Sequence, residues 1–187
     1  MAGLDKSFDA AMFVGYHAST TNPKGVRAHT FSSAKFTRVA LNGKPVTEGA
    51  FNAAVAGHFG VPVIMVAGDN AACAEVQAQV GKMEAVETKR ALSFESADTL
   101  TPAASCELIC FKARTALNRR KDFAPFRVPS PVSLEISFKH YKPVEGLAYL
   151  KGIERIDSHS IRYRGADMLE ISNFLNFIEH YDPNLEP

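Results

Sequence analysis

The chain has 187 residues, of which 46% are hydrophobic and 22% charged, as is typical of a globular protein with a buried core. Its formal net charge is +1, so electrostatics does not favour nucleic acid or an anionic membrane as a partner. No stretch has the apolar length of a membrane span, and the charged residues within 1–10 exclude a secretory signal. The three cysteines are Cys73, Cys106 and Cys110. Without a secretory signal, they predict reduced thiols in a cytoplasmic protein, and we expect all three to lie in the core or to be half-buried.

Strand and helix patterns alternate along the chain, which predicts an α/β fold. In the first half we expect strands at 11–16, 36–41 and 61–67, helices at 48–59 and 69–80, and a loop at 17–34. In the second half we expect an extended segment at 83–92, a helix at 102–118, a proline-rich connector at 122–131, a strand at 132–140, a short helix at 143–150, a hairpin at 153–164 and a final helix at 166–181.

Local signals support several of these elements. Asn42-Gly43 predicts a type I′ hairpin turn after the second strand. Thr47 is expected to cap the helix at 48–59, and Thr101-Pro102 has the cap and first-turn proline of a helix start. The near-continuous apolar run 61–67 predicts a central strand that is covered on both faces.

The order of the elements predicts a layered α/β/α sheet core followed by an antiparallel C-terminal portion. We place the core at 1–125 and the C-terminal portion, a strand, a hairpin and a helix, at 126–187. The chain opens almost directly on the apolar strand at 11–16, and we interpret that strand as buried. Since a buried strand needs a neighbour on each side, we expect the core to be truncated at its N-terminus.

Three side chains are candidates for chemistry by their position. His17 follows the strand at 11–16, at the carboxyl edge where open α/β sheets bind ligands. His29 lies in the glycine- and proline-containing loop that follows, and Glu48 lies in the first turn of a helix. Imidazole and carboxylate groups are ligands that zinc prefers. From position and spacing alone, we favour a hydrogen-bonded histidine at a strand end and a carboxylate that complements a helix dipole over a metal site.

Further residues are candidates for contacts around such a site. Asn52 follows Glu48 by one helical turn, so we expect it to line the same cleft. Lys89 is a candidate contact for a substrate carboxylate. Asp69, after Gly68, either caps the next helix or orients a ligand by a hydrogen bond, and we favour the cap.

Four segments together resemble the M55 family of zinc-dependent D-aminopeptidases. They are F-V-G-Y-H-A at 13–18, P-K-G-V-R-A-H-T at 23–30, L-N-G-K-P-V-T-E at 41–48 and G-V-P-V-I-M-V-A-G-D at 60–69. Their order and spacing agree with the family, which is more specific than any single motif. A-D-M-L-E at 166–170 is similar to the family's C-terminal pattern.

The resemblance implies a metallo-aminopeptidase that releases N-terminal D-amino acids from short peptides. It implies two zinc ions, with His17 and Glu48 as metal ligands and His29 as the catalytic histidine. It also implies a homo-oligomer, which is a decamer in the family. The family's Asp-x-Glu strand and its Asp-Ser-His segment, which supply further ligands, have no counterpart here. The alternative is therefore an inactive truncated remnant that keeps the fold and the oligomerisation surfaces.

Overall fold

The computed structural model describes residues 1–181. The first half of the chain forms β1 (Ala11–Tyr16), β2 (Phe36–Leu41), β3 (Lys44–Pro45), α1 (Glu48–His58), β4 (Val63–Asp69), α2 (Asn70–Val80) and β5 (Glu84–Ala91). The second half forms β6 (Ala97–Thr99), α3 (Pro102–Asn118), the 3-10 turn η1 (Arg120–Asp122), β7 (Val132–Phe138), α4 (Lys142–Leu147), β8 (Ile153–Arg155), β9 (Ser160–Gly165) and α5 (Met168–His180). Within residues 1–181 no helix has the length and apolar character needed to cross a membrane.

The local signals predict most of these elements correctly. Thr47 caps α1 through a hydrogen bond that its hydroxyl accepts from the Ala50 amide at 2.9 Å. Asn42 and Gly43 have φ angles of 48° and 79°, as a type I′ turn requires. The short strand β6 was not predicted, because its three residues have no alternating apolar pattern.

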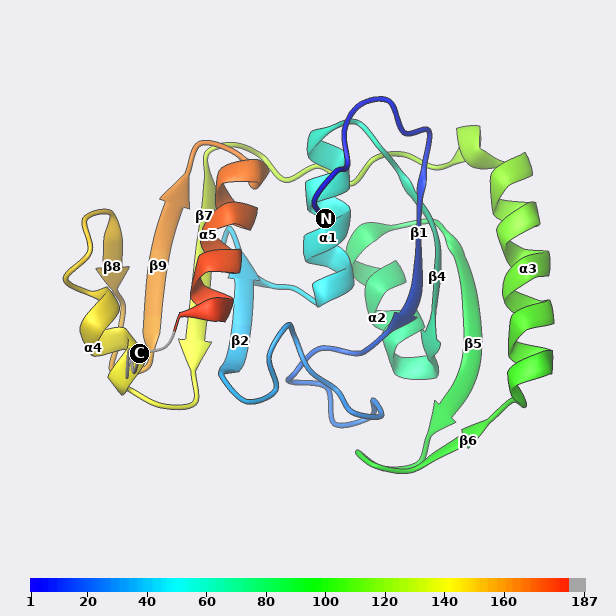
Figure 1. Ribbon diagram of the computed structural model, residues 1–187, viewed down its shortest axis with the longest axis horizontal. Coiled ribbons are helices and arrows are strands. Elements are labelled where there is room, and N and C mark those ends of the chain that lie inside the picture. The colour runs from blue at the N-terminus through cyan, green and yellow to red at the C-terminus, as the bar shows by residue number, and fades with distance from the viewer. Residues whose placement is uncertain (182–187) are drawn as a thin grey trace.

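One sheet carries the parallel strands. Among the described residues it has four strands in the order β1-β4-β5-β6, with β1, β4 and β5 parallel and β6 antiparallel to β5. Every residue of β4 is buried, which confirms the prediction of a central strand. One face packs against α1 and α2, and α3 packs on the other through Ala116 and its neighbours. Figure 1 shows α2 and α3 on opposite sides of β4 and β5, so the layered α/β/α core is confirmed.

The strand β1 corrects one expectation. It lies at the edge of this sheet, and within the described residues its ladder partner is β4. Phe13 is the buried residue of the strand, whereas Val14 is 59% exposed, so the interpretation of 11–16 as a buried strand is wrong. An apolar run indicates that a strand is compatible with burial. Whether it is buried depends on the order of strands in the sheet, which decides if neighbouring elements cover it.

The cysteines also differ from expectation in part. Cys73 is buried, and burial raises the pKa of its thiol to about 11. Cys106 and Cys110 are exposed, because α3 turns their face away from the sheet. For these two thiols the prediction of a core or half-buried position is wrong.

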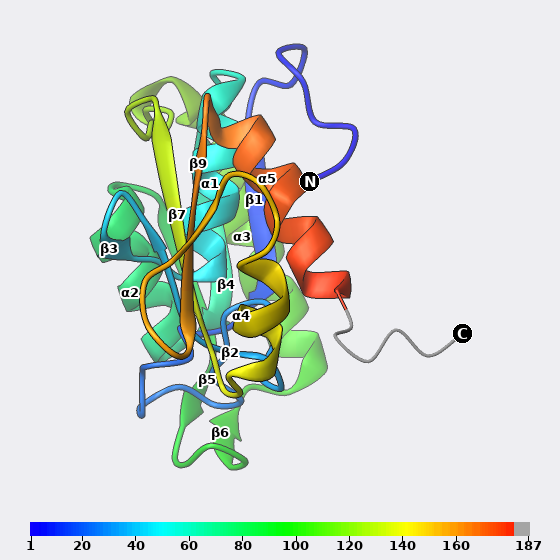
Figure 2. The ribbon, with the colours of Figure 1, turned by 90° about the vertical axis from the view of Figure 1, so that its left-hand side faces the viewer.

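The second sheet is antiparallel and has five strands among the described residues, in the order β3-β2-β7-β9-β8. Its inner face packs against α1, α4 and α5 around a core that includes Phe36, Phe51 and Leu134. Figure 2 shows α5 beside β7 and β9. Because β2 pairs with β7, this sheet takes strands from both sides of residue 125, and α1 contacts both sheets' cores.

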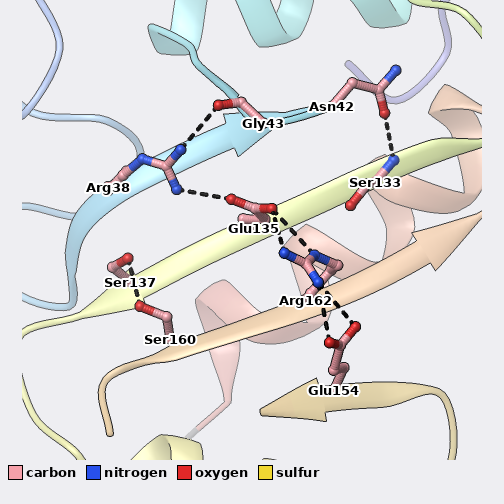
Figure 3. A network of polar contacts seen from close by, with 9 residues as sticks. All are labelled: Arg38, Asn42, Gly43, Ser133, Glu135, Ser137, Glu154, Ser160 and Arg162. Atoms are coloured by element: carbon pink, nitrogen blue, oxygen red, sulfur yellow. Dashed lines mark hydrogen bonds and ion pairs between the residues drawn. The ribbon is translucent and has the colours of Figure 1, made fainter. Parts of the chain in front are cut away.

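The outer face of this sheet carries a ladder of alternating charges (Figure 3). Glu135 on β7 accepts from Arg38 on β2 and from Arg162 on β9, with each N–O distance at 3.0 Å. Arg162 also pairs with Glu154 on β8 at 3.1 Å. The hydrogen bonds from Arg38 and Arg162 hold the pKa of Glu135 below its ordinary value of 4.5, against the opposing effect of burial.

We expect Glu135→Gln to lower the free energy of unfolding by about 1 kcal/mol at pH 7, since part of this network faces water. A carboxyl whose pKa is lowered by folding stabilises the protein above its unfolded pKa and loses that effect as the pH falls through the folded value. The difference from wild type should therefore shrink below pH 4.5. Urea unfolding at several pH values measures it. The control is Glu154→Gln, which removes one partner of a more exposed ion pair and should have a smaller effect. A difference between Glu135→Gln and wild type that does not change with pH would contradict the argument.

Candidate functional site

The site is built at the carboxyl edge of β1, β4 and β5. His17 directly follows β1, and Asp69 is the last residue of β4. The loop at 17–35 crosses this edge and is attached to it by the buried carboxylate of Asp69. The Val26 amide donates to Asp69 Oδ2 at 3.2 Å, while Asp69 Oδ1 accepts from the Ala72 amide at 2.8 Å. Asp69 is thus the predicted helix cap, and it also holds the loop.

His17 and His29 face one another across this loop. Their ring centroids are 4.8 Å apart, with an angle of 42° between the planes. Each Nδ1 contacts a backbone carbonyl, of Val26 at 3.0 Å for His17 and of Arg27 at 2.7 Å for His29. Since a carbonyl oxygen can only accept, each Nδ1 carries the hydrogen and donates it. In the neutral rings, both Nε2 atoms therefore keep a free lone pair for a proton or a metal ion.

Glu48 joins the same loop from the first turn of α1. Its Oε2 accepts from the Phe31 amide at 3.2 Å. Phe31 has a φ angle of 62°, a left-handed conformation that is rare for a bulky residue. The carboxylate thus stabilises a strained turn of the loop, and it remains half-buried rather than fully enclosed.

Asn52 and Tyr16 form the layer beneath Glu48. The Asn52 amide nitrogen donates to the Tyr16 hydroxyl at 3.0 Å. Burial raises the pKa of Tyr16, and the negative charge of Glu48 raises it further, while the hydrogen bond from Asn52 opposes both. Gly49 makes room for Val76 and for this ring, because a Cβ there would lie 2.6 Å from Val76 Cγ2 and 3.3 Å from Tyr16 Cδ1.

We expect Glu48→Gln to lower the pKa of Tyr16, because the substitution removes the charge that disfavours tyrosinate. Ultraviolet absorbance of tyrosinate as a function of pH measures the change, and subtraction of the Tyr16→Phe curve isolates this residue. Glu107→Gln on the exposed face of α3 is the control. An unchanged Tyr16 titration in Glu48→Gln would mean that the carboxylate does not act on this hydroxyl.

The two histidines open into a cavity of about 490 Å³. The lining comes from the loop and from the turn after β5: His17, Arg27, His29, Phe31, Ser32, Ser33, Ala34 and Phe94. Lys89 lies elsewhere, in a separate cavity of about 190 Å³. Asn52 is not part of the lining, since its amide is turned to Tyr16.

The structure therefore brings together some of the candidates and separates others. His17 and His29 are adjacent, and Glu48 is connected to their loop through the Phe31 amide. Lys89 is apart from the histidine cavity, and substrate contacts by Lys89 and Asn52 stay predictions. Phe94 was missed because it lies between short polar stretches. The contact that brings it to the cavity joins segments far apart in the sequence.

The donor chemistry of this site fits zinc, but the placement of the donors does not. Two imidazole Nε2 atoms and one carboxylate are suitable zinc ligands, and a catalytic site needs three protein ligands around the metal. Within residues 1–181 no group of three or more His, Cys, Asp or Glu side chains is close enough to hold a metal ion. His17, His29 and Glu48 thus do not make a complete zinc centre by themselves.

A layered α/β fold with paired histidines at the carboxyl edge of its parallel strands places a candidate site where open α/β sheets bind their ligands. The profile of the Peptidase M55 family, described as D-aminopeptidase, matches residues 1–177, and the chain belongs to this family. The chain is 33% identical over 171 residues to a D-aminopeptidase of Bacillus subtilis (strain 168), an alignment that covers 90% of this chain and 61% of that protein.

A solved structure agrees with this assignment. It is the Zn-dependent D-aminopeptidase DppA from Bacillus subtilis, described as a self-compartmentalizing protease. It matches with a TM-score of 0.88 and 32% identity over 95% of this chain and 65% of that chain. The resemblance inferred from the four sequence segments is therefore confirmed, and so is the α/β fold. The chain spans less than two thirds of the length of each of these relatives.

Proposed function

We propose that this chain carries the histidine-bearing part of a zinc-dependent D-aminopeptidase that releases N-terminal D-amino acids from short peptides. The observation that carries the proposal is the pair His17 and His29, whose Nδ1 atoms are tied to carbonyls so that both Nε2 atoms remain available. In this proposal His17 and Glu48 would hold the zinc, which when bound would supply an activated water and polarise the peptide carbonyl. Further ligands must complete the metal's coordination.

His29 is the residue that moves protons in this proposal. Its Nε2 takes a proton from the water that attacks the peptide carbonyl, and it returns the proton to the departing amine nitrogen. The Arg27 carbonyl, which accepts from Nδ1 at 2.7 Å, supports this role because it stabilises the ring when Nε2 is protonated. Asn52 and Lys89 are proposed contacts to the substrate.

The test compares hydrolysis of D-alanyl-glycyl-glycine with that of its L counterpart. We expect the D peptide to be preferred and His29→Gln to lower kcat by about 100-fold or more. His159→Gln, in the exposed turn between β8 and β9, should leave the rate unchanged. Equal rates for His29→Gln and wild type would remove His29 from the mechanism, and equal hydrolysis of both peptides would contradict the D-aminopeptidase assignment.

The second candidate is a non-catalytic remnant that keeps the fold and its assembly surfaces. It is favoured by the absence of a three-ligand group within residues 1–181. Elemental analysis of zinc in reconstituted and dialysed protein separates the two. Tightly held, stoichiometric zinc supports the enzyme, whereas a metal content near zero together with no hydrolysis supports the remnant.

We also propose that the chain assembles as a homo-oligomer. The supporting finding is that the solved relative is described as self-compartmentalizing. Light scattering coupled to size-exclusion chromatography tests it, and a monomer at micromolar concentration would contradict it.

A further inference from the structure

The turn between β5 and β6 reaches beyond the carboxyl edge of the parallel sheet to the histidine cavity. Its strands pair from Lys89 with Thr99 to Ala91 with Ala97. The turn at 92–96 is closed by hydrogen bonds from the Leu92 and Ser93 amides to the Ser96 carbonyl, at 2.9 and 3.1 Å. Phe94, at the tip, lines the cavity while it remains 51% exposed. A large apolar ring is thus presented to solvent beside the two imidazoles.

A backbone connection holds this turn in position relative to His29. The Arg27 amide donates to the Phe94 carbonyl at 2.7 Å, and the Arg27 carbonyl accepts from His29 Nδ1, also at 2.7 Å. Arg27 has a φ angle of 51°, so its left-handed conformation directs its amide and its carbonyl to these two partners. The side-chain pair of Arg27 with Glu95 is exposed on both sides and contributes little. Phe94 and His29 are therefore linked through a single residue.

The lining of the cavity combines apolar and polar groups. Phe94 and Phe31 supply large apolar rings, and the Phe31 ring packs edge-on against the buried ring of Phe51, with the ring centroids 5.1 Å apart. Arg27, Ser32, Ser33 and the histidines provide the polar groups. Such a combination is typical of sites that orient a ligand by a few polar contacts and hold it by apolar contact.

We propose that Phe94, together with Phe31, determines specificity by receiving the side chain of the N-terminal residue of the substrate. The ligands that these two rings select have an apolar side chain, which in the proposed substrate stands next to the N-terminal amine. This inference rests on the proposed function for the identity of the substrate. The selection itself is a property of the cavity and can be measured without turnover.

The first measurement is the affinity of the protein for glycine, D-alanine, D-leucine and D-phenylalanine. Binding is detected by the NMR signals of the His17 and His29 ring protons. We expect affinity to rise by about tenfold from glycine to D-phenylalanine, because half-exposed apolar surface of Phe94 is covered. Phe94→Ala should abolish most of this gradient, and Phe94→Leu should restore part of it. Leu92→Ala is the matched control, since Leu92 lies in the same turn, is 69% exposed and is not part of the lining.

The second measurement is the ratio of kcat/KM for D-leucyl-glycyl-glycine over D-alanyl-glycyl-glycine. It should fall by about tenfold in Phe94→Ala and stay unchanged in Leu92→Ala. A flat affinity series in the wild type, or a gradient that survives in Phe94→Ala, would overturn the inference even if peptides are hydrolysed. A gradient that depends on Phe94 in a protein that hydrolyses no peptide would support the inference and contradict the proposed function.

Discussion

Replacement of Asp69 by alanine is expected to lower the free energy of unfolding by about 3 kcal/mol and to release the loop that orients His17. The buried carboxylate caps α2 through the Ala72 amide and accepts from the Val26 amide, and both donors lose their partner. The Val26 carbonyl, which accepts from His17 Nδ1, belongs to the same loop segment. Urea unfolding measures the stability, and the NMR signals of the His17 ring report the loop.

Two substitutions separate these effects. Asp69→Asn keeps a side-chain oxygen for the cap but loses the Val26 hydrogen bond, so we expect a loss of about 1–2 kcal/mol. Asp167→Ala removes the cap of α5, where Asp167 accepts from the Leu169 and Glu170 amides far from the site. It should cost about 1 kcal/mol and leave the His17 signals unchanged. Unchanged His17 signals in Asp69→Ala would contradict the proposed connection between Asp69 and the histidine.

Gly57→Ala is expected to destabilise the protein by about 3 kcal/mol, since α1 and the connector after α3 are in backbone contact at this residue. A Cβ at Gly57 would lie 1.8 Å from the Phe126 carbonyl oxygen, so helix and connector must separate. Phe126 packs against the cores of both sheets, and the separation should loosen both. Thermal and urea unfolding measure the loss.

The control is a helical glycine without a backbone neighbour. A Cβ at Gly146 in α4 would meet the hydroxyl of Tyr181, the far end of a flexible side chain, at 2.7 Å. The gain in helix propensity offsets that contact, and Gly146→Ala should stay within about 1 kcal/mol of wild type. Equal stability of the two variants would show that the connector yields to the added methyl group.

The sequence by itself determined most of the elements and the family. Thr47 and the Asn42-Gly43 turn act through hydrogen bonds and dihedral angles within a few residues, so they can be predicted from the sequence without knowledge of the fold. The apolar run of β4 also identified the central strand, because burial of a strand on both faces requires continuous apolar character. The segments around His17, His29 and Glu48 pointed to the M55 family, which the comparisons confirm.

Tertiary structure alone decided how these elements are placed. Strand order put β1 at an edge, left Val14 exposed and paired β2 with β7 across the predicted boundary. The shape of the site also depends on distant pairs: Val26 meets Asp69 43 residues away, and the Phe94 carbonyl meets the Arg27 amide. Such contacts form only when separate segments pack together, and local sequence patterns carry no information about which distant backbone atom completes them.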